Sequence, residues 1–211
     1  EFNDFYRNFM SSAFKGNVDL QFAVITGIMQ MAGSGMFSDF NNADCYTLLD
    51  ERFSTAFGFT HEEVLNLMRL AKREDKFNEA KQWYNGYLFG ETGHVIYNPW
   101  SVLKYVSRNC TPKAYWTNNS DNALLKKELY AMGDENRAKF IALMMEGGHI
   151  EASLPDSLFF SEVASNKAHT LWTLLLSSGY LKAQVKPGPS GMITMDLYIP
   201  NEEVHQIYRR I

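Results

Sequence analysis

Residues 181–200 read LKAQVKPGPSGMITMDLYIP, and this stretch says most about the fold. Residues 180–185 and 192–199 are rich in apolar side chains and flank a turn of glycine and proline, which is typical of a β-hairpin. A helical pattern over residues 164–178 precedes the hairpin, and residues 200–202 begin a terminal helix. Helix, hairpin and helix in this order predict a winged-helix-like unit at residues 149–211.

Helical patterns also dominate the chain before this unit. Thr60 and Glu63 have the spacing of a capping box, which predicts a helix that begins there and ends near residue 73. Other helices are predicted over residues 2–14, 50–57, 76–84, 98–106, 121–132 and 134–145. A short strand is predicted at residues 45–49. The expected fold class is therefore mainly α with minor β, an α+β protein.

The run at residues 20–27, LQFAVITG, is nearly all apolar and ends in glycine. Such a run is typical of a strand that is covered on both faces, as in a parallel sheet. One strand cannot form a sheet, so we expect its neighbours to lie elsewhere or to be missing. Thr26 stands at the carboxyl end of this strand, where open α/β sheets bind ligands.

Composition excludes several classes of protein. The chain has 211 residues with a formal net charge of −4, and 45% of them are hydrophobic, which is too many for a disordered chain. Its purely apolar runs are much shorter than the roughly 20 residues that span a bilayer, so no membrane association is expected. The two cysteines and five histidines show no metal-binding spacing. A reducing compartment, the cytoplasm, is predicted.

The chain offers few residues for catalysis. It has no GxxxxGK[ST] string to hold a triphosphate, and Gly33 and Gly35 lack the spacing of a dinucleotide-binding loop. Residues 83–90 and 97–100 are unusually aromatic, which leaves two interpretations open. One is a hydrophobic corner beneath a long loop. The other is an interaction surface made of Trp83, Tyr84, Tyr87, Phe89 and Trp100.

Several motifs together resemble the bacterial AAA-ATPase-like family of P-loop NTPases, whose members are often fused to a PD-(D/E)XK nuclease-like domain. They include FAVITGI at 22–28, WYNGY at 83–87, YNPW at 97–100 and IPNEEV at 199–204. The resemblance continues through residues 37–42, 50–53, 57–60, 89–90, 115–116, 171–172 and 178–181. It covers essentially the whole chain.

The resemblance implies that this chain is the C-terminal fragment of such a protein. Residues 1–60 would be the end of the P-loop core, a remnant of its α/β sheet with a sensor-type strand. Residues 61–148 would be a helical lid-like region, followed by the winged-helix-like unit. The P-loop and the acidic magnesium-binding strand would lie upstream, so ATP and Mg²⁺ would bind the full-length parent, and the fragment alone would have no cofactor and no catalytic activity.

The resemblance also implies site residues and partners. The nucleotide-sensing candidates are Thr26, Gln30, Asn41 and Asn42. Gln30 replaces an arginine of the family pattern, and Asn85 and Leu88 replace an acid and a base. The implied partners are the missing N-terminal P-loop region and a fused nuclease-like domain, in a bacterial cytoplasm.

Two other functions stay open. The first is a winged-helix nucleic-acid-binding module, but residues 167–211 carry five Lys or Arg side chains against three Asp or Glu, which is a weak basis for binding phosphates. The second is a protein-interaction module without an ATPase role, which would use the aromatic residues. Charge favours the protein-interaction module over the nucleic-acid-binding module.

Overall fold

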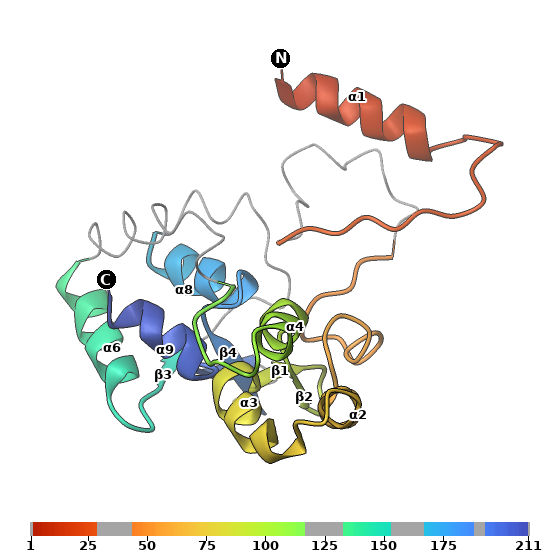
Figure 1. The fold of residues 1–211 in the computed structure, drawn as a ribbon. Helices are drawn as coiled ribbons and strands as arrows, with labels where there is room; N and C mark the ends of the chain where they lie inside the picture. Colours follow the sequence, from red (N-terminus) through yellow and green to blue (C-terminus); the bar gives the residue numbers. More distant parts are fainter. Residues whose placement is uncertain (1, 29–43, 117–132, 153–166, 188–192, 211) are drawn as a thin grey trace.

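The computed structural model describes residues 2–28, 44–116, 133–152, 167–187 and 193–210 (Figure 1). Over these residues, seven α-helices and one short 3-10 helix accompany five strands, which form one two-stranded and one three-stranded sheet. The expected fold class, mainly α with minor β, is confirmed. The predicted helix at residues 121–132 lies outside the described residues.

Residues 59–116 form a helical unit. Its elements in chain order are α2 (His61–Leu70), η1 (Glu74–Lys76), α3 (Phe77–Tyr84), β1 (Tyr87–Phe89), β2 (His94–Ile96) and α4 (Pro99–Ser107). Helix α2 begins at the predicted capping box, in which Thr60 Oγ1 accepts a hydrogen bond from the Glu63 amide at 3.3 Å and the Glu63 carboxylate accepts one from the Thr60 amide at 2.8 Å. The helices predicted at 76–84 and 98–106 are also confirmed. The core of the unit consists of Val64, Met68, Ala80, Tyr84, Tyr97, Val102, Tyr105, Cys110 and Tyr115.

The β1–β2 hairpin was not predicted, because residues 85–93 have the glycine and asparagine content of turns. The two strands pair antiparallel with Leu88 opposite Val95. Each has only three residues, which is too few to show an alternating pattern.

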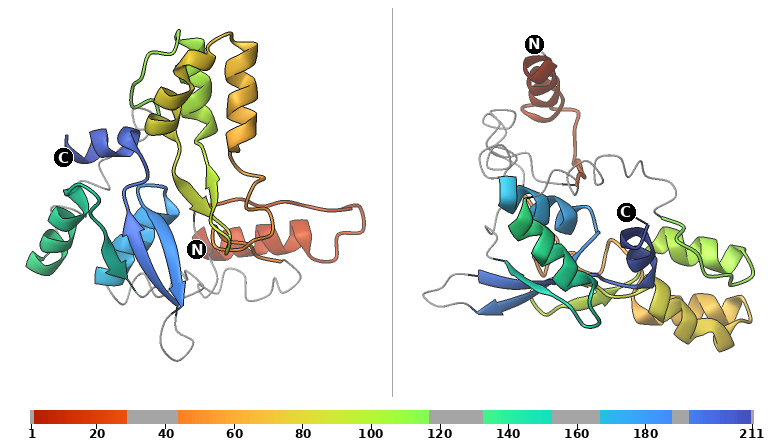
Figure 2. Two further views of the ribbon diagram at one scale, coloured as in Figure 1. Left: turned by 90° about the horizontal axis from the view of Figure 1, so that it is seen from below. Right: turned by 90° about the vertical axis from the view of Figure 1, so that its left-hand side faces the viewer.

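Residues 133–210 contain the C-terminal unit (Figure 2). Its described elements are α6 (Asp134–Met144), β3 (Ile150–Ala152), α8 (Lys167–Ser177), β4 (Lys182–Pro187), β5 (Ile193–Tyr198) and α9 (Glu202–Tyr208). The predicted hairpin, its preceding helix and the terminal helix are confirmed within the described residues. The three-residue strand β3 was missed, and it pairs antiparallel with β5 to give the order β3-β5-β4.

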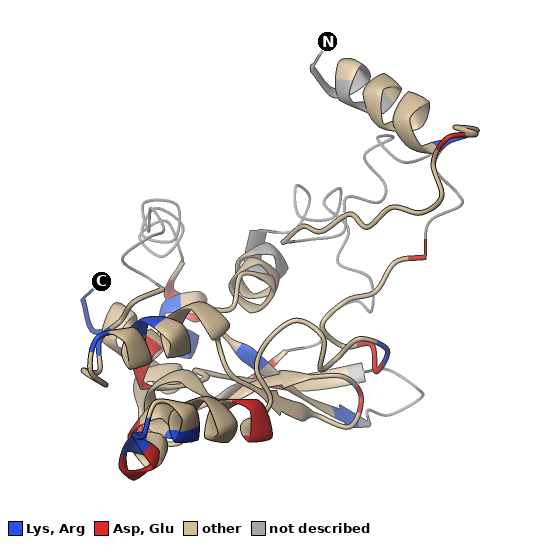
Figure 3. Ribbon diagram, turned by 45° about the vertical axis from the view of Figure 1, so that its right-hand side comes forward, with Lys and Arg blue, Asp and Glu red and all other residues tan. Residues whose placement is uncertain are grey.

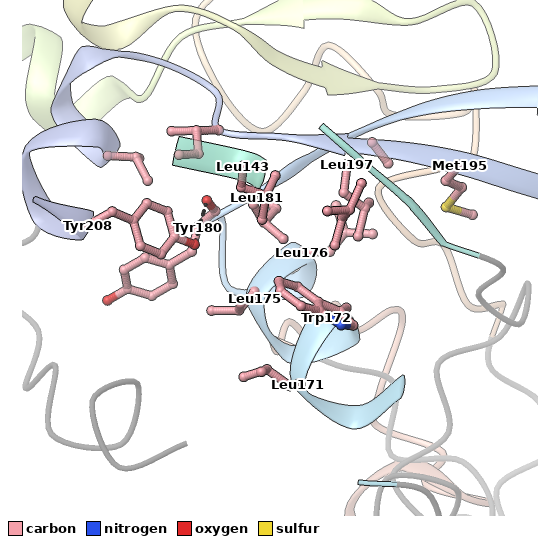
Figure 4. Packing of buried hydrophobic residues seen from close by; sticks show 14 of the residues in the cluster. Leu143, Leu171, Trp172, Leu175, Leu176, Tyr180, Leu181, Met195, Leu197 and Tyr208 are labelled. Atoms are coloured by element: carbon pink, nitrogen blue, oxygen red, sulfur yellow. Dashed lines mark hydrogen bonds between the residues drawn. The ribbon is translucent and has the colours of Figure 1, made fainter. Parts of the chain in front are cut away.

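Helix α8 packs beneath this sheet (Figure 4). Met195 and Leu197 alternate with Asp196 and Tyr198 along β5, so the two apolar side chains share the face that meets the helix. Leu171, Trp172, Leu175 and Leu176 of α8 complete this core. Three partly buried residues from outside the C-terminal unit also pack against this core. They are Leu48, Leu49 and Trp116.

The N-terminal segment corrects one prediction. Helix α1 (Phe2–Phe14) forms as expected, but residues 20–27 are extended without strand pairing. Phe22 is 78% exposed and Val24 is 74% exposed. A strand is stabilised by hydrogen bonds to a neighbouring strand, and no described residue supplies them. Figure 1 shows α1 and this segment apart from the two units.

Residues 44–58 also differ from prediction, because they form turns instead of the expected strand at 45–49 and helix at 50–57. Asp50 Oδ2 accepts hydrogen bonds from the Thr47 amide at 2.6 Å and from Thr47 Oγ1 at 2.8 Å, which closes a turn. Phe53 then has a φ of 69°, a left-handed conformation that cannot continue an α-helix. Local side-chain bonding therefore overrides the apolar pattern here.

Candidate functional site

The described residues include one of the four nucleotide-sensing candidates, Thr26. Thr26 lies in the exposed extended segment. Gln30, Asn41 and Asn42 lie outside the described residues. Their proposed role therefore stays a prediction.

The five aromatic candidates do not form one surface. Tyr84 and Tyr87 are buried, Trp83 and Phe89 are half-buried, and Trp100 is 45% exposed. The buried pair cannot be part of an interaction surface, so that interpretation is corrected for these two residues. Their burial agrees with the alternative of a hydrophobic corner.

Tyr84 occupies the centre of the helical unit. Its ring centroid lies 5.4 Å from that of Tyr105 and 6.3 Å from that of Tyr115. Its hydroxyl donates a hydrogen bond to the Lys113 carbonyl and accepts one from the Lys113 amide, both at 3.1 Å. Burial raises the pKa of Tyr84 well above its ordinary value. Tyr84 thus ties α3 to the segment that follows α4.

Residues of the WYNGY and IPNEEV motifs instead meet in a buried junction between the helical unit and the C-terminal unit. Asn201 caps α9 by accepting a hydrogen bond from the Val204 amide at 3.1 Å, and its Nδ2 donates to the Asn85 carbonyl at 2.9 Å. Beside them, Gly86 has a φ of 101° and packs against Pro200 so closely that a Cβ would lie 2.2 Å from the Pro200 carbonyl oxygen. The WYNGY and IPNEEV motifs are therefore in direct contact.

Glu203 is the central side chain of this junction and is fully buried. Its Oε1 accepts hydrogen bonds from Ser101 Oγ at 3.0 Å and from the Trp116 amide at 2.8 Å. Burial raises the pKa of Glu203, and the hydrogen bonds from the backbone of Trp116, from Ser101 and from the backbone of Tyr115 oppose this rise. One carboxyl group therefore joins α4, the segment after it and α9.

Aromatic packing extends the junction to the start of the β4–β5 hairpin. The ring centroids of Trp116 and Tyr180 lie 5.1 Å apart, and the Tyr208 hydroxyl donates a hydrogen bond to the Tyr180 carbonyl at 3.2 Å. Gly179 lies beside Trp116 and Tyr87 and has a φ of 80°, a left-handed conformation that favours glycine. Residues from four separate motifs thus form one continuous contact.

Sequence reasoning missed Ser101, Asn201 and Glu203 as site residues. Asn201 and Glu203 lie within the IPNEEV motif, and Ser101 directly follows the YNPW motif. Glu203 was missed because two adjacent acidic residues, at 202 and 203, are typical of a solvent-exposed helix face. No group of three His, Cys, Asp or Glu side chains within the described ranges could hold a metal ion. The junction is suited to fixing two units against each other.

A second cluster fastens residues 47–57 to the β1–β2 hairpin. The Glu51 carboxylate accepts hydrogen bonds from the Thr92 amide at 3.2 Å, from Thr92 Oγ1 at 3.0 Å and from His94 Nε2 at 2.7 Å. The bond from the Thr92 backbone, followed by the contact with His94, lowers the pKa of Glu51. The cluster is solvent-exposed.

Replacing Glu51 with glutamine should release this attachment in a pH-dependent way. Because the pKa of Glu51 is lowered in the folded chain, its stabilising contribution is present above pH 4.5 and is lost as the pH falls through the lowered value. We expect Glu51→Gln to lower the melting temperature at pH 7 and to lower it by a smaller amount at pH 3. Glu91→Gln, at an exposed position of the same hairpin, is the control. An equal difference at both pH values would contradict this role.

Comparison with known proteins gives one partial similarity. The chain is 30% identical over 117 residues to an uncharacterized protein in the vnfD 5′ region of Azotobacter chroococcum mcd 1. The match covers 55% of this chain and 22% of that protein, so the chain corresponds to less than a quarter of that relative. No family model and no solved structure matches the chain. Among the helices of the described ranges, none has the length and apolar character needed to cross a membrane.

Proposed function

We propose that this chain is the C-terminal part of a bacterial, cytoplasmic AAA-ATPase-like protein. In this proposal the helical unit is a lid-like region that, together with the winged-helix-like C-terminal unit, couples the ATP state of the protein to a partner. ATP and Mg²⁺ bind a P-loop region outside residues 1–211. The chain itself performs no catalysis.

The observation that carries the proposal is the exposed apolar segment at residues 20–28. Exposed Phe22, Val24 and Ile28 lie in a run that has the composition of a buried parallel strand. The two downstream units, by contrast, each contain a cluster of buried hydrophobic side chains. A sheet and its covering helices, supplied by another part of the parent protein, would pair with this segment and cover both of its faces.

The buried junction supports the coupling role. Glu203, Asn201 and Gly86 hold the two units in one arrangement, so a force applied to the helical unit is transmitted to the C-terminal unit. Four of the motifs that resemble the AAA-ATPase-like family, at residues 83–87, 115–116, 178–181 and 199–204, meet at this contact. The proposed partner is therefore one that the C-terminal unit engages, such as a fused nuclease-like domain.

Val24→Asp in a longer protein that includes the P-loop region tests the proposal. A carboxylate buried between strands is strongly unfavourable, so we expect affinity for Mg-ATP to fall by roughly tenfold or more in calorimetric titration. The same change in the isolated chain should leave its melting temperature unaltered, because Val24 is exposed there. Val18→Asp, which lies just before the predicted strand, is the matched control. Unchanged ATP affinity in Val24→Asp would contradict the proposal, as would micromolar binding of Mg-ATP by the isolated chain.

The nucleic-acid alternative receives less support. Helix α8 has the position of a recognition helix before the hairpin, yet residues 171–178 are all buried or half-buried and include no Lys or Arg. Figure 3 shows Lys and Arg interspersed with Asp and Glu along the ribbon. Electrophoretic shifts measured over a range of salt concentrations would reveal any phosphate-driven binding.

A further inference from the structure

The junction contains buried acceptor atoms that no described donor satisfies. Glu203 Oε2 and Asn85 Oδ1 are both inaccessible to solvent and accept no hydrogen bond from the described residues. The bonds from Ser101 Oγ and from the Trp116 amide both fall on the other oxygen of Glu203, Oε1, and the Tyr115 backbone also lies close enough to lower the pKa of the carboxyl group. The Tyr87 hydroxyl is also buried without a hydrogen-bond partner among the described residues, so it does not donate to either atom. An ionised carboxylate can only accept, so it cannot itself supply the missing donor.

Among the described residues, no cation forms an ion pair with the carboxyl group, and Lys182, whose Nζ would lie 3.7 Å from a Cβ built at Gly86, is a cation beside this contact. The titratable side chains that interact electrostatically with Glu203 are Tyr84 from α3, Tyr87 from β1 and Tyr115 from the segment after α4. All three are neutral phenols whose own pKa values are raised mainly by burial. No Lys, Arg or His of the described residues forms an ion pair with Glu203.

We propose that Glu203 is a proton-binding site that controls how tightly the C-terminal unit is held on the helical unit. In the closed junction the carboxyl group carries a proton on Oε2, while Oε1 keeps its bonds to Ser101 and Trp116. The proton removes an unpaired buried charge and turns Oε2 into a donor. Ionisation of Glu203 loosens α9 from residues 98–116.

The direction of the pH effect follows from burial. Because burial raises the pKa of Glu203 in the folded chain, the stabilisation from the neutral form is fully present below pH 4.5 and is lost as the pH rises through the raised value. Each unit of that rise changes the opening equilibrium of the junction by about tenfold. Glu51, whose pKa is lowered, contributes with the opposite sign.

Titration of the Glu203 side-chain carboxyl by carbon NMR in the full chain tests the proposal directly. We expect a midpoint above 4.5, with protection of the α9 amides from hydrogen exchange falling over the same pH range after correction for intrinsic rates. A midpoint at or below 4.5 would overturn the proposal. So would protection that does not follow the titration.

Two substitutions separate the charge of Glu203 from its shape. Glu203→Gln keeps an acceptor for Ser101 and Trp116 and places a neutral donor at the other position, so it should keep α9 protected at pH 8 at least as well as the unchanged chain. Glu203→Ala should lose protection at every pH. Glu202→Gln, at the neighbouring half-buried position, is the control and should leave the pH dependence in place.

A Glu203→Gln chain that is less protected at pH 8, or that fails to fold, would show that the junction requires the ionised form. The test concerns the junction alone, so its outcome is independent of whether the parent binds ATP.

Discussion

Replacing Gly86 with alanine is expected to separate the C-terminal unit from the helical unit. The new Cβ would lie 2.2 Å from the Pro200 carbonyl oxygen, far inside contact distance, and the clash can be relieved only if the backbone moves. The φ of 101° adds strain for any residue with a Cβ. Together these effects should lower the free energy of unfolding by about 3 to 5 kcal/mol.

Urea denaturation of Gly86→Ala beside Gly93→Ala would divide this loss into its two causes. Gly93 also has a positive φ, 72°, but nothing lies within 4 Å of a Cβ built there. Gly93→Ala should therefore show only the backbone strain, about 1 to 2 kcal/mol. If the two substitutions lower the free energy of unfolding by the same amount, glycine is needed at position 86 only for its backbone conformation, and the contact with Pro200 is unimportant.

Tyr84→Ala should have the second large effect, because Tyr84 fills the centre of the helical unit. Removing a fully buried aromatic ring should cost about 3 to 5 kcal/mol. Tyr84→Phe should cost about 1 to 3 kcal/mol, since it keeps the ring but leaves the Lys113 amide and carbonyl without their partner. Chemical denaturation of both variants gives these values.

Trp100→Ala is the matched comparison for the aromatic residues as a set. Trp100 is exposed on α4, where Lys104 lies 4.5 Å above its ring, and its removal should cost less than about 1 kcal/mol. Equal losses at Tyr84 and Trp100 would mean that burial does not distinguish the two. The expected contrast leaves Trp100, of the five aromatic candidates, as the one best placed to meet a partner.

Local signals in the sequence were sufficient for several elements. The capping box at Thr60, the Asn98-Pro99 start of α4 and the glycine-proline turn of the β4–β5 hairpin each predicted an element that the structure contains. Strands β1, β2 and β3 were missed because three residues are too few to display a period. The expected strand at residues 20–27 failed for another reason, since its pattern describes a buried environment that no described residue provides.

The candidate site was less predictable because it depends on contacts between distant parts of the chain. The sequence alone identified the aromatic motif around Tyr84 but left open whether its side chains were buried or exposed to solvent. It also could not show that Ser101 would meet Glu203, or that Asn85 would meet Asn201. These pairs are brought together only when both units have folded.

The spacing of these pairs along the chain affects the order of folding. Ser101 and Glu203 are 102 positions apart, and Asn85 and Asn201 are 116 apart. The bonds within the α2 capping box, by contrast, join residues three apart. Closing a long loop costs conformational entropy before any contact compensates for it, so local elements form first. Among the described contacts we therefore expect those of the junction to form after the local ones, and a ribosome must complete α9 before the helical unit can make them.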